Sequence, residues 1–452
     1  MSTPTLHFLP LGGAGEIGMN LNLYGFQNRW LMVDCGVMFE RTGPETQAVL
    51  FPDASFIVAQ RHRLEGLVLT HAHQDHIGAV VDLWPKLKCP VYCTRFTAEM
   101  LREPLAEAGL LDKVPIRLLD ERESWKVGPF ELSRIPITHS IVEMGGLLIK
   151  TSAGSVFHTG DFKLDPDPLV GLHTDEAALK RLSELDLLAV VSDSTNADKE
   201  GWTGSEGALV PHLEEVIRDR PGRVAVAMFS TNIARVRSWI LAAHAVGRSP
   251  VLLGRSLEKT VRAAQAAGYL RDVPEIVSAR DFGLLPPENV LLLCTGSQGE
   301  PKAALGRLSS GTHRSAYLEP GDTAVFSSRC IPGCEVSVEQ VQLQLREMGV
   351  SVVTDADAFV HVSGHPCRDE LRALYSWIQA RTVIPVHGTP SKMKAHAELA
   401  RSEGFKSLTV SNGDIVQLSP GEPTIVRRIR TGRHVRREDR PRRPRRSRRF
   451  SR

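Results

Sequence analysis

The sequence predicts an α/β protein that combines an α/β/β/α sandwich with an inserted α/β domain of mostly parallel sheet. From Thr5 to about Val191, short apolar strands dominate and amphipathic helices are few, which suits one half of such a sandwich. From Asp193 onward, helical stretches alternate with continuous apolar strands, and this favours a parallel sheet with helices on both faces. A chain of 452 residues is also too long for one ordinary core.

The individual elements follow from the same patterns. Helices are expected early in the chain at residues 77–84 and 94–108. In the second region, helices are expected at residues 205–219, 232–246, 257–266 and 335–348, and strands at 224–228, 250–253, 290–293 and 323–326. Residues 283–289, with Pro286-Pro287, are expected to form a surface loop.

One segment, Thr70-His71-Ala72-His73-Gln74-Asp75-His76, directly follows the apolar run at residues 67–69. A strand that ends in H-x-H-x-D-H presents two imidazoles to one side and a carboxylate with a third imidazole to the other. Zinc and similar ions favour such ligands, and two ions roughly 3.5 to 4 Å apart can act together on one attacking water. The motif therefore predicts a centre for two adjacent metal ions.

Further ligands follow later strands. His139 comes after the strand-like stretch 132–137, Asp161 after 155–157, and His387 after 382–386. Each of these residues alone is more often an ordinary turn residue. Their order after the H-x-H-x-D-H motif favours a role as ligands.

This set of residues resembles the metallo-β-lactamase superfamily. The resemblance implies two metal sites that share Asp161 as a bridge: His71, His73 and His139 in the first, and Asp75, His76 and His387 in the second. Asp34, in the segment Leu31 to Gly36, matches the family pattern as a residue that orients the ligands.

Because His387 must return to the first metal centre, the parallel-sheet region is expected to be an insertion. The expected parts are residues 1–191 and 351–426 for the metallo-β-lactamase domain, 192–350 for the inserted domain, and 427–452 for a tail.

Three further motifs narrow the resemblance. Ser192 to Asn196, His361-Val362-Ser363-Gly364-His365 and His387 resemble the β-CASP nucleases, the branch of the superfamily that cuts nucleic acids. The segments 12–18, 295–301, 327–329 and 331–333 resemble the ribonuclease J family, and the likeness runs from about residue 5 to about residue 417.

The ribonuclease J resemblance implies a metal-dependent hydrolase that acts on RNA, in RNA maturation and decay. It implies 5′-to-3′ exonuclease action on 5′-monophosphate ends, with endonuclease action left open. Two divalent ions are implied for each chain, with zinc first and manganese second, because His and Asp ligands accept both. His365 is implied as the proton donor to the leaving 3′-oxygen, with Asp193 orienting it and Asp75 also in the catalytic set.

An exonuclease of this kind needs a pocket for the 5′-phosphate. Loops rich in small residues and backbone amides suit an anion. The candidates are Thr295, Gly296, Ser297, Ser328, Arg329, His361, Ser363, Gly364 and His365. Asn232, at the start of an expected helix, is a further candidate for an anion contact.

Some features depart from these patterns. Thr389 follows His387-Gly388 where the family usually has Glu, and Glu143 ends Ser140-Ile141-Val142-Glu143 where S-I-P-D is common.

Gly13 to Gly18 fits the dinucleotide-binding pattern G-x-G-x-x-G, but residues 20–24 continue with strand alternation and open no helix. That segment is therefore expected to shape the rim of the metal cleft.

Charge is distributed unevenly. Residues 427–452 hold fourteen arginines against Glu438 and Asp439, whereas the rest of the chain holds 41 basic and 50 acidic residues. The tail is expected to be disordered until it binds RNA or another polyanion, although it could also fold back on the acidic body.

Seven scattered cysteines favour buried free thiols, and the chain shows neither an apolar run that could span a membrane nor a signal peptide. A cytoplasmic protein is expected, and a homodimer stays open.

Three alternatives also stay open: a β-CASP nuclease that acts on DNA or precursor 3′ ends, a small-molecule metallohydrolase of the thioesterase type, and an RNA-binding scaffold with a degenerate centre.

Overall fold

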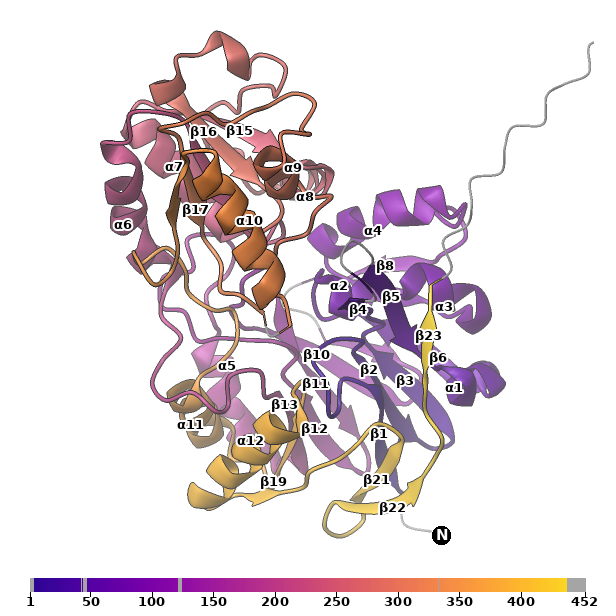
Figure 1. Ribbon diagram of the computed structural model, residues 1–452. Coiled ribbons are helices and arrows are strands. Elements are labelled where there is room, and N and C mark those ends of the chain that lie inside the picture. The colour runs from indigo at the N-terminus through magenta and orange to yellow at the C-terminus, as the bar shows by residue number, and fades with distance from the viewer. Residues whose placement is uncertain (1–3, 42, 44–46, 121–123, 332, 437–452) are drawn as a thin grey trace, which may run out of the picture.

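Two facing sheets form the sandwich in the computed structural model, which describes residues 4–41, 43, 47–120, 124–331 and 333–436 (Figure 1). In spatial order, the first sheet contains β22 (Thr424–Arg428), β21 (Asp414–Ser419), β1 (Leu6–Gly12), β2 (Leu21–Phe26), β3 (Arg29–Val33), β6 (Leu64–Val68), β7 (Val91–Cys93) and β8 (Ile116–Leu118). The second contains β20 (Lys406–Ser407), β19 (Thr382–Val386), β13 (Ala189–Asp193), β12 (Gly154–His158), β11 (Gly145–Thr151), β10 (Phe130–Pro136) and β9 (Ser124–Val127). Between them lies a core that includes Phe8, Leu31, Phe130, Val156 and Ile384.

Helices cover the outer face of each sheet, so the layers run helix, sheet, sheet, helix. The first sheet carries α1 (Ser55–Ala59), α3 (Val80–Leu87) and α4 (Arg95–Glu107), and the second carries α5 (Glu176–Arg181), α11 (Arg368–Ile378) and α12 (Pro390–Ser402) (Figure 1). The short elements η1 (Arg61–Arg63), α2 (Gln74–Ile77) and η2 (Leu182–Leu185) join these layers. The α/β/β/α architecture predicted from the sequence is confirmed.

The inserted domain is a parallel sheet with helices on both faces. Its spatial order is β15 (Ser249–Leu253), β16 (Val290–Cys294), β14 (Val224–Ala227), β17 (Thr323–Phe326) and β18 (Ser351–Val353). One face carries α6 (Glu206–Arg218), α7 (Ile233–Ala245) and α8 (Arg255–Ala267), and the other carries α9 (Ala304–Ser309) and α10 (Glu335–Glu347). The four helices and four strands expected here lie within about two residues of their predicted ends, which is the usual scatter of helix and strand boundaries.

The chain leaves the sandwich after β13 and returns to it in α11 and β19. β13 and β19 are neighbouring parallel strands, with Asp193 opposite Val386. The excursion from one to the other builds the whole upper lobe of Figure 1. Where the lobes meet, α8 packs against α4, and the Tyr269 hydroxyl donates to Glu143 Oε1 at 3.1 Å. Residues 283–289, expected as a loop, overlap the 3-10 turn η3 (Phe282–Leu284) and contain a second one, η4 (Pro287–Asn289).

The prediction of a disordered tail is wrong for residues 427–436. β22 pairs with β21, and β23 (Arg433–Val435) pairs with β5 (Gln47–Pro52), which in turn pairs with β4 (Met38–Arg41). The physical reason is that arginines of this segment meet acidic side chains of the body: the pairs are Arg428–Asp414, Arg433–Glu16 and Arg436–Asp82. A count of charge along the chain cannot distinguish these arginines from the later ones. Residues 437–452 lie outside the described residues.

The cysteines are free thiols. Five are buried, whereas Cys330 and Cys334 are partly exposed, so the expectation of burial fails for these two. Within the described part of the chain, no helix combines the length and the apolar character needed to cross a bilayer.

Candidate metal centre and phosphate loops

The predicted ligands meet at one edge of the sandwich. β12, β13 and β19 run parallel and adjacent, so their carboxyl ends lie together and bring Asp161, Asp193 and His387 close in space. β6 of the facing sheet ends just before the H-x-H-x-D-H segment, whose last residues form α2. His139 follows β10. Strand ends from both sheets therefore supply the site.

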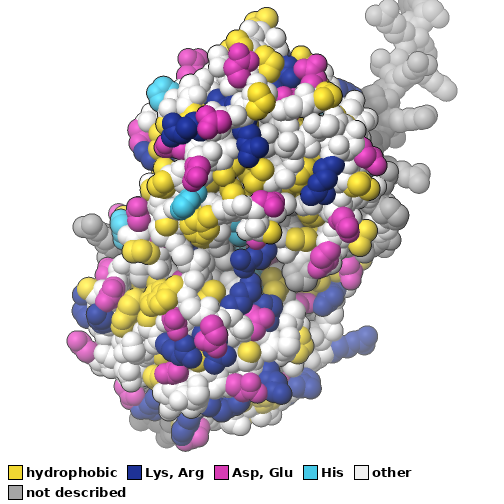
Figure 2. Space-filling model, turned by 60° about the vertical axis from the view of Figure 1, so that its left-hand side comes forward, with side chains coloured by type: hydrophobic (Ala, Val, Ile, Leu, Met, Phe, Trp, Pro, Cys, Tyr) yellow, Lys and Arg dark blue, Asp and Glu magenta, His cyan; other side chains and the backbone are white. Residues whose placement is uncertain are grey.

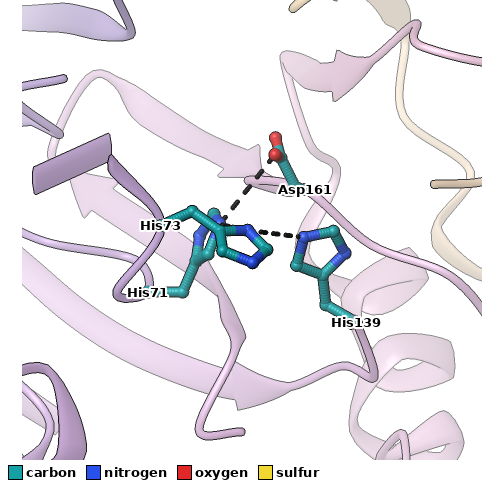
Figure 3. Close-up of side chains that lie close together, drawn as sticks. All are labelled: His71, His73, His139 and Asp161. Carbon is teal, nitrogen blue, oxygen red and sulfur yellow. Dashed lines mark hydrogen bonds and ion pairs between the residues drawn. The ribbon is translucent and has the colours of Figure 1, made fainter. Parts of the chain in front are cut away.

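The first group consists of His71, His73, His139 and Asp161 (Figure 3), whose ligand atoms all lie within 4.8 Å of one another. His71 Nε2 and His139 Nε2 each lie 3.1 Å from His73 Nδ1. The other nitrogens of two of these rings are engaged, since His139 Nδ1 donates to the Gly364 carbonyl at 2.5 Å and His71 Nδ1 lies 3.0 Å from Thr70 Oγ1. Their Nε2 lone pairs therefore face the same point, as a cation would require.

The second group consists of Asp75, His76, Asp161 and His387. His76 Nε2 lies 3.0 Å from Asp161 Oδ2, and His387 Nε2 lies 3.1 Å from Asp75 Oδ2. Asp161 belongs to both groups, which is the position that the resemblance implies for a bridging carboxylate. The structure thus brings all seven predicted ligands together.

The ligand rings of His76 and His387 are also oriented by partners. His76 Nδ1 donates to Asp34 Oδ2 at 2.7 Å, and the same carboxylate accepts from the Thr70 amide at 2.8 Å. His387 Nδ1 lies 2.9 Å from Thr195 Oγ1, which donates to Asp193 Oδ1 at 2.7 Å. Such contacts fix the tautomer and the direction of a metal-binding imidazole.

Thr195 is a site residue that the sequence interpretation missed. It lies in the Ser192 to Asn196 motif, but nothing in the sequence indicated that its hydroxyl would reach His387. At Thr389, where the resemblance implies Glu, the hydroxyl oxygen Oγ1 lies 3.0 Å from Ser391 Oγ.

Burial and charge divide the imidazoles into two kinds. Burial, with the neighbouring imidazoles, lowers the pKa of His71 and His139, and burial lowers the pKa of His73 to about 4. These three rings are therefore uncharged near neutral pH, and each can offer a nitrogen lone pair to a cation. Burial would also lower the pKa of His387, but Asp161, Asp193 and Asp75 raise it to about 10.

The carboxylates stay ionised in this surrounding. Burial alone would raise the pKa of Asp161, yet His387 and His76 lower it to about 2. Crowded buried carboxylates require positive charge nearby, from protons on imidazoles or from cations. The neutral rings, whose lone pairs converge beside these carboxylates, fit divalent metal ions.

The glycine-rich segment lies at this centre. It joins β1 to β2, and no helix follows it. The Gly13 carbonyl accepts from the His387 amide at 2.6 Å, and Asn20 Nδ2 lies 3.0 Å from His76 Nε2. Gly13 has a φ of +87°, and a Cβ there would lie 2.3 Å from Asn20 Oδ1, so glycine is required.

A third group places the predicted proton donor beside the ligands. It contains Asp161, Asp193, His365 and His387. His365 Nδ1 donates to Asp193 Oδ2 at 2.8 Å, and its ring stacks on that of His387 with centroids 5.6 Å apart. The His365 carbonyl accepts from Thr203 Oγ1 at 2.7 Å, which fixes the backbone there.

The predicted phosphate loops gather at the carboxyl ends of the inserted sheet. Because β14, β16 and β17 are parallel, with Ala227 opposite both Cys294 and Phe326, the loops that follow them share one edge. This edge is where open α/β sheets bind ligands. It carries Thr295, Gly296 and Ser297 after β16, and Ser328 and Arg329 after β17.

Hydrogen bonds join these loops. Gln298 Nε2 donates to the Arg329 carbonyl at 3.0 Å, and Ser327 Oγ donates to the Val360 carbonyl at 2.7 Å, next to His361. His361 Nδ1 is buried and has no hydrogen-bond partner among the described residues. Two hydroxyls have protein partners, since Thr295 Oγ1 accepts from the Ala304 amide and Ser363 Oγ accepts from Asn196.

The proposed anion contact of Asn232 is not supported. Its side chain is buried and both ends are engaged: Oδ1 caps α7 by accepting from the Arg235 amide at 2.9 Å, and Nδ2 donates to Glu206 at 3.0 Å. Asn232 is the N-cap of α7, which is the ordinary role of Asn at that position.

Comparisons with known proteins agree with this geometry. Three family models match: "Ribonuclease J, beta-CASP domain" over residues 221–345, "Beta-lactamase superfamily domain" over 29–218, and "Zn-dependent metallo-hydrolase RNA specificity domain" over 349–410. Ribonuclease J of Sinorhizobium meliloti is 42% identical and matches over 93% of this chain and 76% of its own length. Ribonuclease J of Mycolicibacterium smegmatis is 40% identical, over 95% and 77%. A crystal structure of a protein of unknown function from Enterococcus faecalis has a TM-score of 0.61 at 15% identity, over 92% of this chain and all of that one, and so shares the fold.

Proposed function

Because the chain belongs to the ribonuclease J family of metal-dependent ribonucleases, we propose that it removes nucleotides one at a time from 5′-monophosphorylated RNA. One observation carries this proposal: the segment His361 to His365 serves both halves of the site. His361 lies beside the phosphate loops, the Gly364 carbonyl accepts from the ligand His139, and His365 lies against His387. One segment of five residues can therefore contact both the 5′-phosphate and the first phosphodiester bond of the RNA.

Two divalent ions are proposed for each chain, zinc first and manganese second. His71, His73, His139 and Asp161 would hold one, and Asp75, His76, Asp161 and His387 the other. Bound there, the ions would polarise the phosphoryl oxygens and make water a better nucleophile. Gly364 has a structural part in this arrangement, because a Cβ there would lie 2.8 Å from Ser140 and 2.9 Å from His139.

His365 supplies the proton for the leaving 3′-oxygen. Burial would lower its pKa, but Asp193 and Asp161 raise it above the ordinary value, so the ring carries the proton to be donated near neutral pH. Asp193 is fully enclosed and accepts from Nδ1, which leaves Nε2 free to face the substrate.

Basic side chains border the junction of the two lobes. On the face shown in Figure 2, dark blue Lys and Arg side chains lie next to one another where the lobes meet. Burial and then the charges of Arg329 and Lys392 lower the pKa of Lys199, so both of these cations act on Lys199. Such a cluster attracts the phosphates of a single strand.

The direct test compares one RNA sequence with a 5′-monophosphate, triphosphate or hydroxyl, labelled at either end, with zinc or manganese added. Mononucleotides released from the monophosphorylated RNA are expected. Internal fragments alone would contradict the proposal, and a DNA of the same sequence separates RNA from DNA specificity.

Arg329→Ala is expected to lower kcat/KM for 5′-monophosphorylated RNA about tenfold. The Arg329 side chain is more than half exposed, with Nε 3.5 Å from Asp355 Oδ2. Its guanidinium can contact the terminal phosphate through a charged hydrogen bond, which contributes about 1.5–3 kcal/mol. RNA with a 5′-hydroxyl should lose less than about threefold, because it lacks that phosphate. Arg307→Ala, an exposed arginine of the same lobe, is the control. An equal loss on both RNAs would exclude a role in reading the 5′ end.

Deleting residues 437–452 is expected to weaken RNA binding while kcat at saturating RNA stays the same. The deletion removes nine arginines but keeps β23 and the Arg436–Asp82 pair. For every arginine removed that binds a phosphate of the RNA, the slope of log K against log salt should become shallower by about 0.7. Deleting all of residues 427–452 should in addition lower the thermal unfolding temperature, since it also removes β23. If the salt slope is the same with and without residues 437–452, the tail does not bind the RNA backbone.

A further inference from the structure

Arg235 is an unusual residue for the middle of a domain, because its whole guanidinium is buried. It lies on α7 and is 1% exposed. Glu206, equally buried on α6, accepts from Nε at 2.9 Å and from Nη2 at 3.1 Å. Burying an arginine costs free energy unless every donor finds an acceptor. The acceptors of the remaining N–H groups therefore show which segments Arg235 fixes in place.

These N–H groups donate hydrogen bonds to two of the phosphate loops. Nη1 donates to the Ser327 carbonyl at 3.1 Å, to Ser327 Oγ at 2.9 Å and to the Val360 carbonyl at 3.0 Å. Nη2 also reaches the Val362 carbonyl at 3.5 Å. Ser327 precedes Ser328 and Arg329, and the two valines flank His361. One side chain thus fixes the backbone on both sides of the expected 5′-phosphate pocket.

The same network continues into the sandwich. The Glu206 amide donates to Asp165 Oδ2 at 2.9 Å, and Lys163 Nζ lies 2.7 Å from the same oxygen. The Lys163 amide donates to the Thr138 carbonyl at 2.8 Å, one residue before the ligand His139. A continuous buried chain of polar contacts therefore runs from the phosphate loops to the segments that carry His139 and Asp161.

We infer that Arg235 is a positioning residue that sets the span between the 5′-phosphate loops and the metal centre, and with it the length of the product released from the 5′ end. The inference rests on the proposed 5′-monophosphate exonuclease function. An exonuclease that releases single nucleotides must keep this span constant, and a misplacement of about 1 Å can reduce the rate about 100-fold. Lysine cannot replace the guanidinium, because a single ammonium cannot pair with both Glu206 oxygens and also reach two carbonyls.

The test compares wild-type protein with Arg235→Lys on 5′-monophosphate and 5′-hydroxyl RNAs. We expect kcat/KM for the monophosphate RNA to fall about 10- to 100-fold, with KM rising, so that the preference over 5′-hydroxyl RNA largely disappears. Dinucleotides should join mononucleotides among the first products. Hydrolysis of bis(p-nitrophenyl) phosphate, a small diester that needs the metal centre but no 5′ end, should fall at least about tenfold less.

Arg248→Lys is the matched control. Arg248 is also buried in the inserted domain and donates to the carbonyls of Gly222 and Val290 at 2.9 and 3.1 Å, beside the amino ends of β14 and β16. It should lower thermal stability without changing the 5′-end preference or the product length. Ser327→Ala, which removes one hydroxyl from the network, should move both readouts in the same direction as Arg235→Lys but by less, and it serves if Arg235→Lys does not fold.

The outcomes separate the two proposals. If wild-type protein shows no preference for a 5′-monophosphate, the proposed function fails and this inference fails with it. If wild-type protein shows the preference and Arg235→Lys keeps it together with single-nucleotide products, the inference alone is overturned; where Arg235→Lys does not fold, the same result with Ser327→Ala overturns it. If Arg235→Lys loses the small diester and the RNA equally, Arg235 is structural only, and the inference is again overturned.

Discussion

Asp161→Asn should reduce RNA cleavage on the order of 1,000-fold or more and should lower the content of bound metal. Asp161 is the one carboxylate common to all three groups of candidate ligands. The amide keeps the shape of the side chain but removes the negative charge between His76 and His387. Metal ions supply several kcal/mol of transition-state stabilisation, and each 1.36 kcal/mol corresponds to a factor of about ten.

Metal content by elemental analysis and cleavage rate at saturating zinc or manganese are the two measurements. Circular dichroism should show an intact fold, since one oxygen is exchanged for one nitrogen. Asp112→Asn, an exposed aspartate in the same lobe, is the matched control and should change neither quantity. Full activity of Asp161→Asn without added metal would remove the bridging role of this carboxylate.

His365→Ala should lower kcat by about 100- to 10,000-fold, the range that a positioned general acid contributes. Its ring touches the rings of His139 and His387, but its Nδ1 is bound to Asp193 and its backbone to Thr203. The metal content and KM should therefore change little, in contrast to the Asp161 variant. His62→Ala, an exposed histidine, serves as the control.

The role of His365 as acid can be separated from any other role by the leaving group. An RNA with sulfur in place of the bridging 3′-oxygen releases a thiolate, which needs no proton. The defect of His365→Ala should shrink at least about tenfold on this substrate, whereas the defect of Asp161→Asn should not. An undiminished defect of His365→Ala on the sulfur-containing RNA would mean that the imidazole does not protonate the leaving group.

Much of the site was predictable because its residues lie at strand ends. Apolar runs mark the strands, and a polar residue just after such a run, as with His139 or Asp161, has a fixed direction once the sheet forms. The helices of the inserted domain were equally predictable, because their amphipathic spacing and flanking turn residues are local signals. These features depend on short stretches of sequence.

What the sequence could not supply depends on contacts between distant segments. Asn232 was expected to bind an anion, but its local signal is identical to that of an N-cap, and only Glu206 on α6 decides between them. Thr195 reaches His387 from the end of a neighbouring strand, although the two residues are 192 positions apart in the chain. Three arginines of residues 427–436 meet acidic side chains only because the chain returns along β21 and β5: the pairs are Arg428–Asp414, Arg433–Glu16 and Arg436–Asp82.

The late strands have a consequence for synthesis of the protein. β21 completes the sheet beside β1, β23 pairs with β5, and His387 joins ligands that begin at His71. A nascent chain on the ribosome therefore has β1 without β21 and β5 without β23 until these late strands have emerged. Contacts of such sequence separation form slowly and late. A ribosome-bound nascent chain thus lacks a complete set of metal ligands until His387 has emerged from the ribosome.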